Sequence, residues 1–163
     1  MENSEISSRT FFSTLALMHA GMVVGLVLFL SIAFYINASG GYEGNIELIV
    51  FIWVIPLVAV SGMIASILVF RAKIQKARGI EDFVSRLSAY KTALIIRWAL
   101  LEGPALLAVI GYLISGEILF FSIAVMLIMI LLISRPSRKK LAMDLQLSSI
   151  EKILINDPAA MIS

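Results

Sequence analysis

Four long apolar runs restrict what this chain can fold into more than any other feature of its sequence. They cover residues 11–36, 48–70, 93–114 and 118–133, and short polar segments separate them. A helix needs about 20 apolar residues to cross the hydrocarbon core of a bilayer, so three runs are ample and the fourth is just long enough. Backbone groups cannot stay unpaired in lipid, and no run shows the two-residue alternation of barrel strands. The sequence therefore predicts an all-α bundle of four transmembrane helices, at about 11–36, 47–77, 81–114 and 118–135.

The positions of the thirteen lysines and arginines predict how the bundle is oriented. Arg9 precedes the first run, seven cations lie from Arg71 to Arg97, and five follow the fourth run. The two remaining connections, 37–47 and 115–117, contain none. Cytoplasmic loops of membrane proteins carry an excess of these residues. We therefore expect a multi-pass protein of the cell inner (plasma) membrane with both termini in the cytoplasm.

The longer connection between the second and third runs is expected to be largely helical. Apolar residues recur there at helical spacing, at Ile80, Phe83, Val84, Leu87 and Tyr90. We expect the second helix to continue to about residue 77, the chain to break near Gly79, and the third helix to begin near Glu81. A short amphipathic helix on the membrane surface is the alternative.

After residue 136 the chain returns to the composition of a soluble segment, which divides it into a transmembrane domain, 1–136, and a short helical cytoplasmic tail, 137–163. Pro136 ends or kinks the fourth helix because proline lacks an amide hydrogen. Ser148 and Glu151 have the spacing of a capping box, which predicts a short helix in the tail. The tail has an apolar side too small to form its own core. It docks either on the end of its own bundle or on a cytoplasmic protein.

Glu102 is the residue that most directly points to a chemical role. It lies nine residues after Ala93, or about 13 Å into the membrane at 1.5 Å per residue. An ionisable group at that depth is costly unless it is paired or neutralised, and such groups are candidates for proton or ion pathways. The alternative is a neutral carboxyl that bonds a neighbouring helix.

His19 is expected at about the same depth as Glu102, roughly 12 Å from the same membrane face. A histidine and a carboxylate at matched depth fit either a proton relay or a single structural hydrogen bond between helices. Arg97 lies nearer the interface, where its long side chain extends to the cytoplasm as an anchor.

Small residues and prolines mark expected helix contacts. Gly21 and Gly25 form a G-x-x-x-G pair, the spacing that lets two membrane helices approach closely, either within the monomer or between subunits. Gly103 and Pro104 directly follow Glu102, and with Pro56 they are expected to bend or locally unwind their helices. Carbonyls freed in this way beside a buried carboxylate are how discontinuous helices build ion sites.

The motifs of the common enzyme and binding classes are missing from this sequence. There is no nucleophile elbow, zinc-protease motif or phosphate loop, and one histidine without cysteine does not make the usual metal site. No basic face interleaved with aromatic residues indicates nucleic-acid binding. We expect no catalytic residues, metal or cofactor, and a role other than that of an enzyme.

Residues 97–114, Arg-Trp-Ala-Leu-Leu-Glu-Gly-Pro-Ala-Leu-Leu-Ala-Val-Ile-Gly-Tyr-Leu-Ile, resemble the ion-binding helix of the ATP synthase c subunit. In that family an ion-carrying carboxylate lies mid-membrane in a stretch rich in alanine and leucine. The resemblance implies that Glu102 is the ion-binding carboxylate. The chain as a whole resembles the uncharacterised small four-helix proteins of bacterial inner membranes, a likeness that implies no particular function.

Two hypotheses of function follow. In the first, the protein is an oligomerising subunit, in a homo-oligomer or a larger membrane complex, that binds a proton or cation at Glu102 with help from His19. In the second, it is a structural or accessory protein that transports nothing and holds a cytoplasmic partner through its tail. The lipid bilayer is the partner that both require, and neither involves nucleic acid.

Overall fold

The computed structural model describes residues 6–40, 49–157 and 161–162. The helices are α1 (Ser8–Ala38), α2 (Ile49–Arg78), α3 (Phe83–Ser115), α4 (Ile118–Ile133), α5 (Arg138–Asp144) and α6 (Ser149–Asn156). Two residues near each chain end, β1 (Ile6–Ser7) and β2 (Met161–Ile162), pair antiparallel. The prediction of an all-α fold is confirmed. The four long helices begin and end within three residues of the predicted bounds, except that residues 47 and 48 lie outside the described residues.

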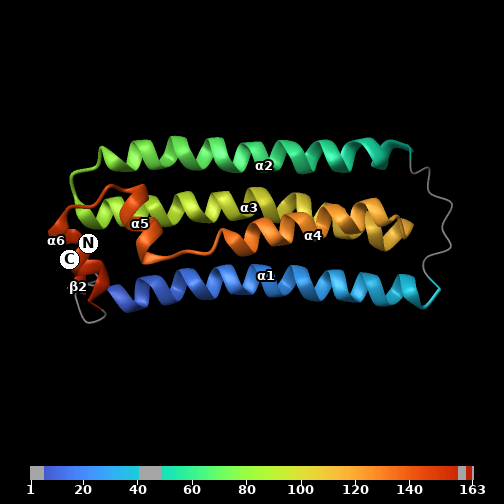
Figure 1. Ribbon diagram of the computed structural model, residues 1–163, viewed down its shortest axis with the longest axis horizontal. Helices are drawn as coiled ribbons and strands as arrows, with labels where there is room; N and C mark the ends of the chain where they lie inside the picture. Colours follow the sequence, from blue (N-terminus) through green and yellow to red (C-terminus); the bar gives the residue numbers. More distant parts are fainter. Residues whose placement is uncertain (1–5, 41–48, 158–160, 163) are drawn as a thin grey trace, which may run out of the picture.

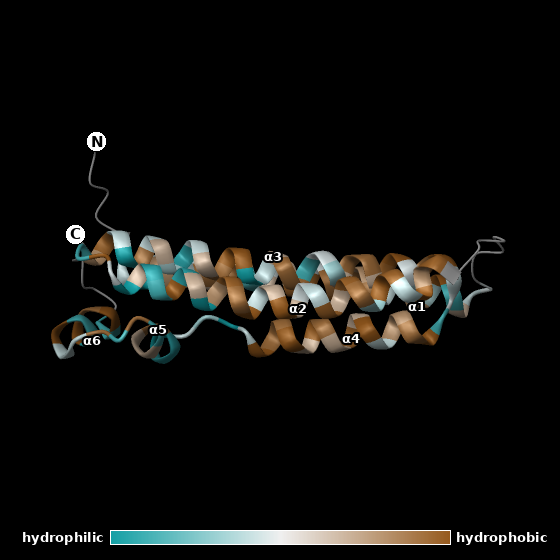
Figure 2. Ribbon diagram, turned by 90° about the horizontal axis from the view of Figure 1, so that it is seen from above, coloured by the Kyte–Doolittle hydropathy of each residue, from teal (hydrophilic) through white to brown (hydrophobic). Residues whose placement is uncertain are grey.

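The helices form two layers (Figures 1 and 2). One layer holds α2, α3 and α1 side by side with α3 in the middle, and α4 packs against α3 and α1 from the second layer. Seen from above, α5 and α6 continue the layer of α4 (Figure 2). They lie at the end of the bundle that also holds both chain ends, which we call the tail end.

Three helices are long and apolar enough to cross a membrane: Ser8–Ala38, Val50–Arg78 and Phe83–Ser115. A fourth span exists if Ile118–Ile133 and Arg138–Asp144 count as one element, although these two helices are bent by 82° relative to each other. A 33-residue helix such as α3 is about 50 Å long, well beyond the roughly 30 Å of a hydrocarbon core. These helices make the chain a membrane protein.

Local signals determine where α3 begins and ends. Asp82 caps its first turn, since its carboxylate accepts a hydrogen bond of 2.7 Å from the Ser85 amide, and this bond lowers the pKa of Asp82. At the other end Gly116 adopts a left-handed conformation, φ 68°, and its amide bonds Tyr112 O. The break between α2 and α3 occurs at residues 79–82, as predicted, and no separate surface helix forms there.

The prolines do not unwind their helices. α2 runs through Pro56 and α3 runs through Pro104 without interruption, so the expected discontinuous helix beside Glu102 is not formed. Pro104 instead packs against Gly62 of α2. A Cβ atom added to Gly62 would lie 2.5 Å from Pro104 Cγ and 2.8 Å from Leu100 O. The two helices therefore approach closely only because residue 62 has no side chain.

The tail docks on its own bundle. Leu141, Leu145, Leu147 and Ile155 are almost fully buried, whereas the opposite side of α6 stays exposed. The predicted capping box is formed, because Ser148 Oγ accepts from the Glu151 amide and Glu151 Oε2 accepts from the Ser148 amide. The docking buries apolar side chains that are too few to form a core of their own.

Polar contacts fix α6 against the beginnings of α1 and α3. Arg86 of α3 forms an ion pair with Glu151 of α6. Ser8 Oγ, at the start of α1, donates a 2.8 Å hydrogen bond to Ile155 O. The tail thus ties the beginning of the chain to its end.

Candidate functional site

Glu102 lies on α3 at the border between the buried face and the surface of the helix. Its neighbours Leu101 and Ala105 point into the core, whereas Ala99 and Gly103 are exposed, and Glu102 itself is partly buried. Among the described residues it makes no hydrogen bond and no ion pair. An unpaired carboxyl inside an apolar helix is unfavourable in lipid unless it takes up a proton, a cation or a partner from outside the chain.

His19 is buried in the bundle with 5% of its surface exposed. Its Nε2 donates a 2.8 Å hydrogen bond to Leu131 O of α4, so the proton is on Nε2. Its ring lies 5.0 Å from the Trp98 ring, centroid to centroid. No hydrogen bond or ion pair joins it to Glu102 in the described chain. His19 therefore links α1 to α4 and α3, and the relay with Glu102 stays a prediction.

The contact of His19 belongs to a larger arrangement that closes the end of α4. The last carbonyls of a helix have no partner inside it. Lys140 Nζ donates to Ile133 O at 2.8 Å, and Trp98 Nε1 donates to Ser134 O at 3.2 Å. Leu131 O accepts from His19 in addition to the Ser134 amide. We call these three side chains the α4 cap.

The α4 cap draws on three other helices, α1, α3 and α5. Two of its members, Trp98 and Lys140, were not predicted as site residues. The sequence does not identify these two residues. It shows only that α4 must end before Pro136, which leaves carbonyl groups at the end of the helix without intrahelical hydrogen-bond donors. The positive charge of Lys140 also suits the negative end of the α4 dipole.

The cap fixes the level of Glu102 along the bundle. Trp98 reaches Ser134, the residue that directly follows α4, and Glu102 comes four residues after Trp98, or about 6 Å along α3. His19 reaches Leu131, within the last turn of α4. Both predicted site residues thus lie close to the tail end of α4, and Glu102 is near the midpoint of α3.

The predicted contact glycines do not pack inside the described bundle. Added Cβ atoms at Gly21, Gly25 and Gly103 would meet nothing within 4 Å. Pro104, by contrast, does contact α2 at Gly62. The structure therefore does not support a helix contact of Gly21 and Gly25 within one chain. A contact of this pair between subunits stays a prediction.

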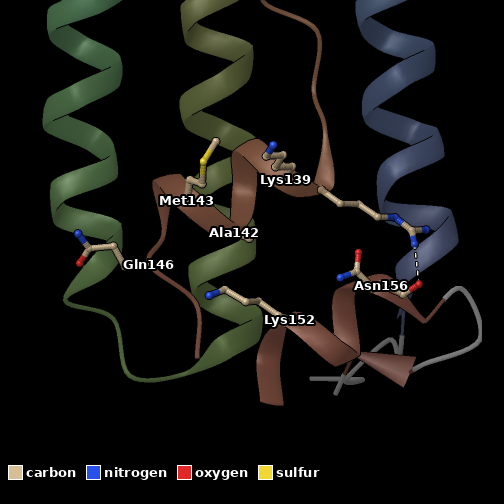
Figure 3. A pocket seen from close by; sticks show the side chains of 7 residues that line it. Lys139, Ala142, Met143, Gln146, Lys152 and Asn156 are labelled. Atoms are coloured by element: carbon tan, nitrogen blue, oxygen red, sulfur yellow. Dashed lines mark hydrogen bonds between the residues drawn. The ribbon is translucent and has the colours of Figure 1, made fainter. Parts of the chain in front are cut away.

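Cavities at the tail end carry clusters of cations. One, of about 560 Å³, opens between α5 and α6 and is lined by Arg138, Lys139 and Lys152 (Figure 3). Its arginine is already engaged, because Arg138 donates to Asn156 O at 2.8 Å and lies over the Phe12 ring. Another, of about 270 Å³, lies where α4 ends and is lined by residues of α2, α3 and α5.

No cluster of three or more metal-ligating side chains is present in the part of the chain that the structure describes. Comparison with protein-family models, with curated proteins and with solved structures gives no match to this chain.

Proposed function

We propose that α1, α2, α3 and α4 each cross the inner membrane, with both chain ends and the tail in the cytoplasm. Both termini lie at one end of the bundle, as an even number of spans requires. The cation-lined cavities are at that same end. The distribution of positive charge then follows the rule for cytoplasmic segments.

Within this bundle, we propose that the protein is an oligomerising subunit that binds a proton or cation at Glu102. The observation that carries the proposal is that Glu102 has no partner among the described residues, although it lies in an apolar helix. If the end of α4 marks the membrane boundary, Glu102 lies about 6 Å inside it, shallower than the sequence suggested. A carboxyl at that depth is still unfavourable when charged and alone.

The surface around Glu102 suits an approaching second copy. Ala99 and Gly103 are small and exposed beside it, and a Cβ at Gly103 would meet nothing within 4 Å. Small residues let helices of neighbouring subunits come close in a bilayer. In this arrangement the proton or cation is held between copies, while His19 keeps α1 against α4.

Transport by purified protein in sealed vesicles tests this proposal. We expect Glu102→Gln to abolish proton or Na⁺ movement, because the amide carries no titratable charge, and Glu102→Asp to retain part of it. Glu117→Gln is the matched control, since Glu117 is exposed at the start of α4. Unchanged transport in Glu102→Gln, or a strictly monomeric protein by light scattering, would argue against the proposal.

A second function is favoured by the outer side of α6. Ile150 and Ile153 are 73% and 69% exposed, and Leu154 lies beside them at helical spacing. This apolar side is the part of the tail that docking leaves uncovered, and it fits an accessory protein that holds a cytoplasmic partner. The double change Ile150→Ser and Ile153→Ser keeps the buried residues intact. If a pull-down recovered the same partners with the wild type and with the double variant, this function would be excluded.

A further inference from the structure

The cavity where α4 ends combines apolar and cationic walls. Phe70, Leu94 and Ile133 supply apolar surface, and Arg97, Arg135 and Lys140 supply positive charge. Ile133 is the last residue of α4 and is largely exposed on its outer side. The cavity therefore lies at the junction between an apolar span and a polar end of the molecule.

Arg97 is the unusual member of this cavity. Its Nε is buried and has no hydrogen-bond partner, and none of its nitrogens donates a hydrogen bond to another described residue. It lies over the face of the Phe70 ring, 4.8 Å from guanidinium carbon to ring centroid, and its charge acts on the Asp144 carboxyl without an ion pair or a hydrogen bond to it. A guanidinium carries five donors in a planar fork, and leaving them unused in a partly buried position is costly. The fork therefore calls for an acceptor that the described part of the chain does not supply.

The balance of charge around the cavity indicates the sign of that acceptor. Asp144 is the carboxylate that lines the cavity, and its Oδ2 already accepts from Tyr90 at 3.3 Å. Asp144 also lines the neighbouring cavity with Arg71 and Arg78, so that five cations surround one carboxylate. The carbonyl of Ile133 is covered by Lys140. The excess of positive charge favours an anion.

We propose that this cavity binds the phosphate headgroup of an anionic lipid, with Arg97 as the bidentate donor and Arg135 as the second cation. Arginine forks match phosphate oxygens in pairs, and basic pockets between membrane helices take anionic headgroups. The apolar walls at the end of α4 favour a phosphate that carries acyl chains over a free one. This inference depends on the chain spanning a membrane and not on the role of Glu102.

Lipid binding to the full chain in mild detergent tests the proposal. The probes are phosphatidylglycerol, phosphatidylcholine and inorganic phosphate, and the readouts are bound lipid by native mass spectrometry and thermal unfolding followed by tryptophan fluorescence. We expect phosphatidylglycerol to bind about tenfold more tightly than phosphatidylcholine, and Arg97→Gln to remove about that factor. Lys139→Gln is the control, because it also removes one positive charge, but from the cavity between α5 and α6. It should change phosphatidylglycerol binding by less than about twofold.

Arg135→Gln keeps the proposal testable if Arg97→Gln does not fold, because Arg135 is exposed and its side chain makes no hydrogen bond within the described chain. It should also weaken phosphatidylglycerol binding severalfold. Equal binding of the two lipids, or equal losses in Arg97→Gln and Lys139→Gln, would overturn the proposal in favour of diffuse attraction. Stabilisation by inorganic phosphate at the concentration effective for the lipid would overturn it in favour of a soluble ligand. Glu102→Gln should leave lipid binding unchanged.

Discussion

Replacement of Gly62 by alanine tests how closely α2 and α3 approach. The added methyl would lie 2.5 Å from Pro104 Cγ and 2.8 Å from Leu100 O. Both atoms belong to the rigid framework of α3 and not to the end of a flexible side chain, so the helices must separate. Overpacking of this kind costs about 1–3 kcal/mol.

The helix propensity of alanine acts in the opposite direction, by about 1 kcal/mol relative to glycine. In the dispersed monomer, Gly25→Ala provides the matched control, because a methyl there meets nothing within 4 Å in the same chain and gains the same propensity. The difference between the two variants therefore isolates the overpacking term. We expect Gly62→Ala to be less stable than Gly25→Ala by about 1–3 kcal/mol.

Reversible unfolding in mixed micelles measures this difference. Trp98 is fully buried and Trp53 is 76% exposed, so a Trp53→Phe background leaves one core fluorophore as the reporter. Pro104→Ala in the Gly62→Ala background removes the nearest contact and should restore part of the loss, since residues in contact couple by about 0.5–3 kcal/mol. Equal stability of Gly62→Ala and Gly25→Ala would refute the close approach of α2 and α3.

Two further predictions concern the α4 cap and the tail. His19→Phe keeps a ring against Trp98 but removes the hydrogen-bond donor to Leu131 O. We expect this change to lower the free energy of unfolding by about 1–3 kcal/mol in the same assay. Met18→Leu, at an exposed neighbouring position, is the control. Burial alone would raise the pKa of Glu151, but the hydrogen bonds from Ser148 and the charge of Arg86 outweigh it and lower that pKa below 4.5. The Glu151 contribution to tail docking, at most about 1 kcal/mol, is therefore fully present above pH 4.5 and is lost as the pH falls through the lowered value. Hydrogen exchange of α6 between pH 6 and pH 3 should show this loss in the wild type and not in Glu151→Gln; the same pH response in both would contradict it.

The individual helices could be predicted from the sequence because their signals are local. A run of apolar residues long enough to span lipid fixes a helix, since the backbone has no other way to satisfy its polar groups there. The capping box of Ser148 and Glu151 and the break near Gly79 depend on residues within one turn of each other. Such features do not require knowledge of what the helix packs against.

The neighbours of each helix could not be predicted in this way, because an apolar run carries little information about which face turns inward. Gly21 and Gly25 have the spacing of a contact motif and lie on the surface, whereas Gly62, without such a motif, is where two helices meet. The sequence alone determined that the chain is a helical membrane protein. It also showed that two of the three connections between the apolar runs contain no lysine or arginine. Only the tertiary structure decided that His19 and Trp98 close the end of α4, that Glu102 has no partner within the described chain, and that Arg97 faces a cavity, because these facts depend on side chains brought together from separate helices.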